Sequence, residues 1–181
     1  MLFRLNIYLS EEDYLAFNIF HAIESEEGKR IVRKSRRFFV LLMAVLAVLI
    51  VRVMELSVSS LVFAGIILLF TVFYMMFFKK LMAKNVKKQL ERIKKTGKLP
   101  YDPVSTMEFY DDKMVEITEL TRIDKGYNAL ERICVYRERY ILAYHSSVGA
   151  YIFPVEQVEA QMNRDEFMSF LLSKCSRVEY Y

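Results

Sequence analysis

The chain has 181 residues, of which 54% are hydrophobic, and a formal net charge of +4. The charge is uneven: residues 29–98 hold sixteen basic and two acidic residues, whereas residues 1–28 and 101–181 each carry a net charge of −5. A nucleic-acid-binding domain needs a basic patch on its folded surface. Since both polar segments are acidic, we exclude nucleic acid as the expected partner.

The first segment, residues 1–28, predicts a strand followed by a helix. Apolar and polar residues alternate over residues 3–9, as in a half-buried strand. Ser10 and Asp13 have the spacing of a capping box at the start of a helix. About thirty residues cannot bury a core of their own, and a lone strand needs a sheet. We therefore expect residues 1–28 to pack on the C-terminal segment as part of one cytoplasmic domain.

Two apolar runs follow, over residues 38–54 and 57–78. The second has 22 residues without a charge; as a helix it would be about 33 Å long, enough for a membrane core of about 30 Å. One helix through both runs would be about twice that thickness. The sequence therefore predicts a hairpin of two transmembrane helices within residues 29–98, with its turn near Glu55–Ser57.

Basic residues flank this predicted hairpin on both sides. The nine that we take as a candidate membrane-interface belt are Arg33, Lys34, Arg36, Arg37, Lys79, Lys80, Lys84, Lys87 and Lys88. Cytoplasmic flanks of membrane helices carry the Lys/Arg excess, so we expect a two-span plasma-membrane protein with both termini in the cytoplasm. Each basic residue would gain about 1 kcal/mol from anionic lipid; a specific headgroup site is the alternative reading of the belt.

Residues 79–96 predict a further helix, because Met82, Val86, Leu90 and Ile93 recur at helical spacing. The helix could be a stem that extends the second span, or it could lie on the membrane surface as a basic amphipathic helix.

Residues 101–181 predict an α+β domain. Short apolar stretches with turn residues between them indicate antiparallel strands over 105–110, 113–119, 133–136, 140–144 and 150–153. The tripeptide 124–126 reads as a turn, and Asn163 as the cap of a closing helix. Strands followed by a helix favour one strongly bent antiparallel sheet closed by that helix.

No residue pattern in the chain indicates catalysis. Cys134 and Cys175 are too far apart for a metal motif, and we expect both to be reduced thiols. A nucleophile pair of Cys134 and His145 would lack an orienting third group. We therefore predict no enzymatic activity, no metal and no cofactor.

Three patches resemble a known family. Residues 9–18 resemble the opening strand and capped helix of the YcxB-like family of bacterial two-span membrane proteins, residues 140–154 resemble its final hairpin, and residues 167–174 resemble its closing helix. The resemblance implies a pleckstrin-homology-like (PH-like) cytoplasmic domain, a bacterial plasma membrane and no assigned activity.

These observations favour a non-enzymatic, membrane-anchored binding or regulatory module that presents its PH-like domain to a cytoplasmic protein. A domain with a net charge of −5 is poorly suited to anionic phosphate, which favours a protein ligand. Two alternatives stay open. One is an accessory subunit of a transporter, or an immunity-type protein, acting through small residues of its spans such as Ser60 and Gly65. The other is a sensor of anionic lipid.

Overall fold

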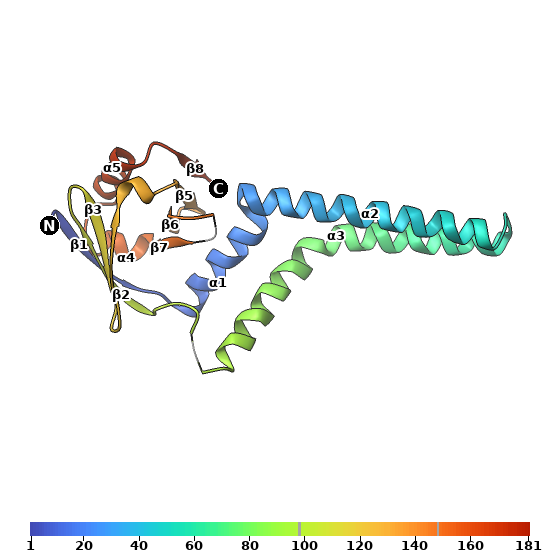
Figure 1. The fold of residues 1–181 in the computed structure, drawn as a ribbon, viewed down its shortest axis with the longest axis horizontal. Coiled ribbons are helices and arrows are strands. Elements are labelled where there is room, and N and C mark those ends of the chain that lie inside the picture. The colour runs from blue at the N-terminus through green and yellow to red at the C-terminus, as the bar shows by residue number, and fades with distance from the viewer. Residues whose placement is uncertain (98, 148) are drawn as a thin grey trace. The chain divides into compact units, whose positions relative to one another are not determined.

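The computed structural model describes residues 1–97, 99–147 and 149–181, which form two compact units (Figure 1). The first comprises Met1–Phe20 and Leu90–Tyr181 and is called the β unit below. The second comprises His21–Gln89 and is called the helical unit. The β unit is thus built from two separate parts of the chain, and the helical unit is the segment between them.

The first sheet of the β unit joins the N-terminal strand to strands that follow α3. Its four antiparallel strands lie in the order β1 (Phe3–Tyr8), β2 (Val104–Phe109), β3 (Lys113–Ile117) and β4 (Arg122–Gly126). Leu5 of β1 pairs with Met107 of β2, and both side chains are buried. The prediction that the N-terminal strand joins the C-terminal strands is confirmed.

The second sheet has the order β7 (Ala150–Pro154), β6 (Tyr140–Tyr144), β5 (Arg132–Tyr136) and β8 (Val178–Tyr180). The α+β class with antiparallel strands is confirmed, but the arrangement differs from the single bent sheet that we expected. The described residues form two sheets, and β8 pairs with β5 in parallel. β8 is three residues long, too short to show an alternation, and the predicted turn 124–126 belongs to the polar edge strand β4.

Helices cover the second sheet. α1 (Glu11–Ile19) places Phe17 against one face, in a cluster with Tyr136, Leu142 and Tyr144. The other face joins the main core, to which α5 (Arg164–Lys174) contributes Phe167. Strands buried on both faces are apolar at successive positions, which explains the unbroken runs in β5 and β6. The short helix α4 (Val155–Glu159) was not predicted.

Side chains cap the helices where the sequence placed the caps. The Ser10 hydroxyl accepts from the Asp13 N–H at the start of α1, and the Asp13 carboxylate accepts from the Ser10 N–H in return. At α5 the Asn163 side chain accepts from the N–H groups of Asp165 and Glu166. Both predicted N-caps are confirmed.

The helical unit contains α2 (Glu26–Val53) and most of α3 (Val58–Lys94), after a π-helical segment over Phe20–Glu24. Residues 54–57 join the two helices, with Glu55 at a positive φ of 55°. The helices contact each other, since the Phe39 and Tyr74 rings stack at 3.9 Å. α3 continues without a break to Lys94, so the helix predicted over residues 79–96 extends the second apolar run.

In the described part of the chain, α3 is the one helix long and apolar enough to cross a membrane by length and composition. Only 6% of its most apolar stretch is buried. In α2 the apolar run is shorter, because Arg36 and Arg37 precede it and Arg52 lies near its end. A single membrane-crossing helix is thus compatible with the structure, and the second span stays a prediction.

Candidate functional site

The α2 part of the basic belt forms a shallow groove of about 400 Å³. It is lined by Arg33, Lys34 and Arg37 together with Arg30, which the predicted belt did not include. All four side chains are exposed. Arg33, Lys34 and Arg37 follow Arg30 by three, four and seven residues, which puts all four on one helix face. This spacing could have identified Arg30 from the sequence. The guanidinium groups match the geometry of phosphate oxygens.

Arg36, a predicted member of the belt, lies apart from this groove. It is half-buried, its Nη2 donates to the Met75 carbonyl of α3 at 2.8 Å, and its guanidinium lies 5.5 Å from the Phe78 ring. Arg36 therefore stabilises the α2–α3 contact. The sequence alone could not separate it from Arg37, because the face that α3 covers was unknown.

The α3 members of the belt are exposed lysines: Lys79, Lys80, Lys84, Lys87 and Lys88. Four of them, from Lys80 onward, recur at helical spacing and share one face. The Lys80 ammonium lies 5.6 Å from the Phe77 ring at the end of the apolar run. Such lysines can keep their ammonium groups in water while their stems cover apolar surface.

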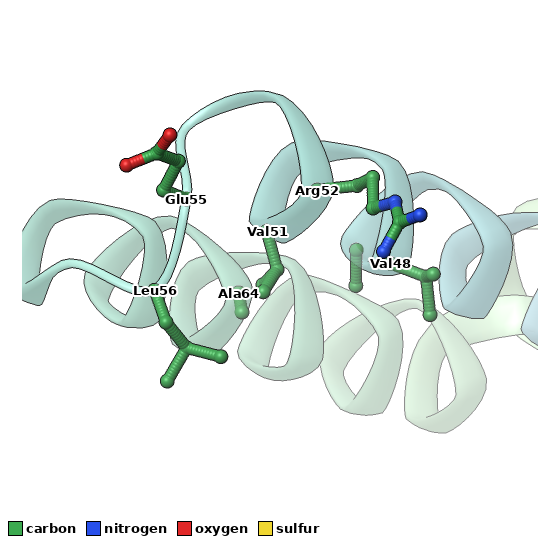
Figure 2. A pocket seen from close by; sticks show the side chains of 7 residues that line it. Val48, Val51, Arg52, Glu55, Leu56 and Ala64 are labelled. Atoms are coloured by element: carbon green, nitrogen blue, oxygen red, sulfur yellow. The ribbon is translucent and has the colours of Figure 1, made fainter.

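A cavity of about 530 Å³ lies beside the turn between α2 and α3. It is lined by Ala47, Val48, Val51, Arg52, Glu55, Leu56 and Ala64. Figure 2 shows the Glu55 carboxylate turned away from the Arg52 guanidinium, which extends beside Val48. The charged groups do not converge, so this cavity is an apolar gap between helices with no constellation for catalysis.

The β unit holds a more polar cavity of about 300 Å³, which we call the sheet cavity. Its apolar floor comes from both sheets and α1, and includes Ile7, Phe17, Met107, Ile152 and Phe153. Its polar wall consists of Tyr14, Tyr101, Asp102, Ser105, Glu116, His145 and Tyr151. The sequence patterns did not predict this site. One signal was available: Glu116 follows the buried Met114 at the two-residue period of β3, which turns a carboxylate toward the core.

Burial shifts the titration of the groups in the sheet cavity. Burial raises the pKa of Glu116 above its ordinary value, and the nearby Asp102 adds to that rise while Lys125 opposes it. Burial lowers the pKa of His145, and Lys125 lowers it further. Burial also raises the pKa of the Tyr151 phenol. Burial thus disfavours the charged form of Glu116, of His145 and of Tyr151 alike.

The structure gives Cys134 and His145 different surroundings. The buried Cys134 thiol donates to the Glu179 carboxylate at 3.6 Å, and burial followed by the Glu179 charge raises the pKa of Cys134 to about 12. The His145 ring packs 5.0 Å from the Tyr151 ring. A thiol with such a pKa is protonated at neutral pH and is a poor nucleophile. Among the described residues, no three His, Cys, Asp or Glu side chains are grouped so as to hold a metal ion.

The chain matches no protein-family model, no curated protein and no solved structure. The fold and the residues described above thus define its class: an α+β protein with a helix that could cross a membrane. The features that bear on its activity are the basic groove, the apolar helices and the sheet cavity.

Proposed function

We propose that this protein is a non-enzymatic, membrane-anchored binding or regulatory module. In this proposal α2 and α3 cross the plasma membrane as a hairpin, both termini lie in the cytoplasm, and the β unit binds a cytoplasmic protein. The observation that carries the proposal is the exposed apolar surface on the sides of α3 that α2 does not cover, bounded by basic residues at one end.

The exposure of α3 supports insertion in lipid. Within one stretch of α3, Ile66, Leu68, Leu69 and Phe70 are each more than half exposed, at 55%, 65%, 72% and 56%. Since neighbouring residues of a helix point in different directions, no single partner face covers them all. Apolar patches of this extent are rare on the surfaces of soluble proteins, whereas lipid chains would surround them at no cost.

The distribution of charge supports the orientation. The groove residues of α2 precede its apolar run, and Lys79 to Lys88 follow that of α3. The joining residues 54–57 have no basic side chain, and Arg52 is the one cation nearby. An excess of Lys and Arg marks the cytoplasmic side.

We also propose membership of the YcxB-like family, with a PH-like β unit. The proposal is supported by the order of the elements: four strands, three strands and the helix α5, with α2 and α3 inserted after β1 and α1. Membership would place the protein in a bacterial plasma membrane and would leave its activity open, because the family has no assigned one.

The topology is testable with single cysteines introduced at Glu55 and Lys95. Both sites are exposed, and the two native cysteines are buried. In intact cells we expect a membrane-impermeant maleimide to label the Glu55→Cys variant, and to label Lys95→Cys only after the cells are lysed. Labelling of both variants, or of neither, in intact cells would contradict a hairpin with an external turn.

The binding role is testable by purifying the full-length protein from its native membrane in mild detergent and identifying the bound molecules by mass spectrometry. A stoichiometric cytoplasmic protein that is lost on deletion of residues 101–181 is the expected result. If the deletion variant still binds the partner, the transmembrane helices make the contact. That result would favour an accessory subunit of a transporter. Enrichment of one anionic lipid without a protein would favour lipid sensing, which the basic groove supports as the second candidate.

A further inference from the structure

The sheet cavity has a feature that packing does not explain. Glu116 turns a carboxylate from the middle of β3 toward the core side of the first sheet, two residues after the buried Met114. In the described residues, the Glu116 carboxylate makes no hydrogen bond or ion pair with another side chain. A partly desolvated, unpaired carboxylate costs stability, so its presence points to a ligand that would pair with it.

The walls of the cavity define which ligand would fit. The Tyr101 ring stacks on the Tyr14 ring at 4.4 Å, and the Tyr151 ring packs against the His145 ring. Aromatic faces attract cations, and they stack with planar guanidinium groups. The Tyr151 ring already has a cation near it, since the Lys125 ammonium lies 5.5 Å from its centroid. The apolar floor suits an alkyl stem.

The charges select the same class of ligand. Glu116 lies within the cavity, and the exposed Asp102 carboxylate lies at its wall. Arg and Lys do not occur among the residues that line it. The Lys125 ammonium interacts with Glu116 electrostatically but makes no ion pair with it, so a cation in the cavity would meet a carboxylate that has no bonded partner.

We propose that the sheet cavity binds an arginine side chain of the protein partner, with its guanidinium against the Glu116 carboxylate and the tyrosine rings and its methylenes on the apolar floor. This rests on the proposed function, because it names the chemistry by which the β unit would recognise a protein. A volume of about 300 Å³ accommodates one long side chain and not a folded element.

The experiment uses the full-length protein in detergent with its methionines labelled by ¹³C in the methyl group. Met107 lines the cavity and is 1% exposed, so its methyl resonance, assigned with Met107→Leu, reports occupancy. The probes are n-butylguanidinium, which resembles an arginine side chain, and n-butylurea, its neutral analogue of similar shape. We expect butylguanidinium to shift the Met107 resonance saturably, with an affinity about tenfold above that of butylurea.

Two matched variants assign the effect to Glu116. Glu116→Gln removes the charge with little change in shape and should abolish most of the preference for butylguanidinium. Glu119→Gln removes an exposed charge in the connection that follows β3 and should retain the preference. Equal affinities for the two probes, no saturable shift of Met107, or a preference that survives in Glu116→Gln would each overturn the proposal. The titration contains no partner, so its failure would leave the co-purification test of the proposed function intact.

Discussion

Gln161 binds the backbone of Asn6 through both ends of its side-chain amide. The Asn6 N–H donates to Gln161 Oε1 at 2.8 Å, and Gln161 Nε2 donates to the Asn6 carbonyl at 2.8 Å. Gln157 makes the same pair of bonds with Tyr8, at 2.8 and 2.6 Å. β1 is an edge strand, whose free backbone groups can recruit another chain. The two glutamines occupy these groups as a neighbouring strand would.

The Gln161→Glu substitution tests this arrangement. A carboxylate can still accept from the Asn6 N–H but cannot donate to the Asn6 carbonyl, which it would repel. We expect the free energy of unfolding to fall by about 1–2 kcal/mol, measured by denaturant titration in detergent. Gln89→Glu, at an exposed position of α3, is the matched control and should be neutral. Equal effects of the two substitutions would show that the Gln161 bonds contribute nothing.

The turn between β5 and β6 is strained in a way that a substitution should relieve. Arg137 and Glu138 are the central residues of a β-turn that the Arg139 N–H closes on the Tyr136 carbonyl at 3.1 Å. Both have a positive φ, of 52° and 55°, and a turn with this backbone favours Asn-Gly. A left-handed conformation costs about 1–2 kcal/mol for an ordinary residue. We expect the double substitution Arg137→Asn/Glu138→Gly to raise the thermal unfolding midpoint.

The control for this turn is Glu119→Gly, in the connection between β3 and β4, where φ is not positive. There a glycine relieves no strain and only adds freedom to the unfolded chain, so it should lower the midpoint slightly. A double variant no more stable than the wild type would indicate that the contact of Arg137 with the Tyr136 ring, at 4.9 Å, offsets the strain.

Glu116 should make stability depend on pH. Folding raises its pKa above the ordinary value of 4.5, so the folded chain holds this proton more tightly than the unfolded chain does. Stability is therefore lost as the pH rises from the ordinary pKa through the raised one, and the loss persists at neutral pH.

The Glu116→Gln variant, which cannot ionise, should unfold at a higher temperature than the wild type at about pH 7 and at nearly the same temperature at about pH 4. Asp102, His145, Lys125 and Tyr151 also interact with this region, and they stay unchanged in the variant, so the difference between the two proteins isolates Glu116. Glu119→Gln provides the exposed control. A stability difference that is constant with pH would contradict the raised pKa.

The basic groove predicts salt-sensitive binding to anionic lipid. Changing Arg30, Arg33, Lys34 and Arg37 together to glutamine should weaken the retention of anionic lipid during purification, with a loss of about 1 kcal/mol for each charge. Added salt should reduce retention by the wild type more than retention by the variant, which still has the lysines of α3. Arg52→Gln is the control, because it removes a cation at the other end of α2. If Arg52→Gln weakens retention as much as the groove variant does, the groove has no special role.

The parts of this fold that depend on neighbouring residues could be predicted from the sequence. The other parts depend on contacts between distant segments of the chain. The Ser10 and Asn163 caps need only neighbouring residues, so their sequence signals were sufficient. β8 forms because β5 offers it a parallel partner, which three residues cannot reveal. The separation of Arg36 from Arg37 required knowledge of the face that α3 covers. The sheet cavity joins residues of β1, β3 and β7, which only the folded topology brings together.

At Gly28 the neighbouring backbone leaves no room for a side chain. It lies in the first turn of α2, where a Cβ would come within 2.5 Å of the His21 carbonyl oxygen and 2.7 Å of the Ala22 carbonyl carbon. The Ser25 hydroxyl holds this turn together, because it donates to the His21 carbonyl at 2.7 Å and accepts from the Gly28 N–H at 3.0 Å. The colliding atoms are backbone atoms, so no rotation of a side chain can relieve the contact.

We therefore expect Gly28→Ala to lower the free energy of unfolding by about 1–3 kcal/mol, the usual cost of overpacking. Gly65 provides the control: it lies within α3, and a Cβ there would meet nothing within 4 Å. Alanine is the better helix former by about 1 kcal/mol, so Gly65→Ala should leave the thermal midpoint in detergent unchanged or raise it. If both substitutions are tolerated equally, the close approach of the π-helical segment to α2 is not needed for folding, and Gly28 has no packing role.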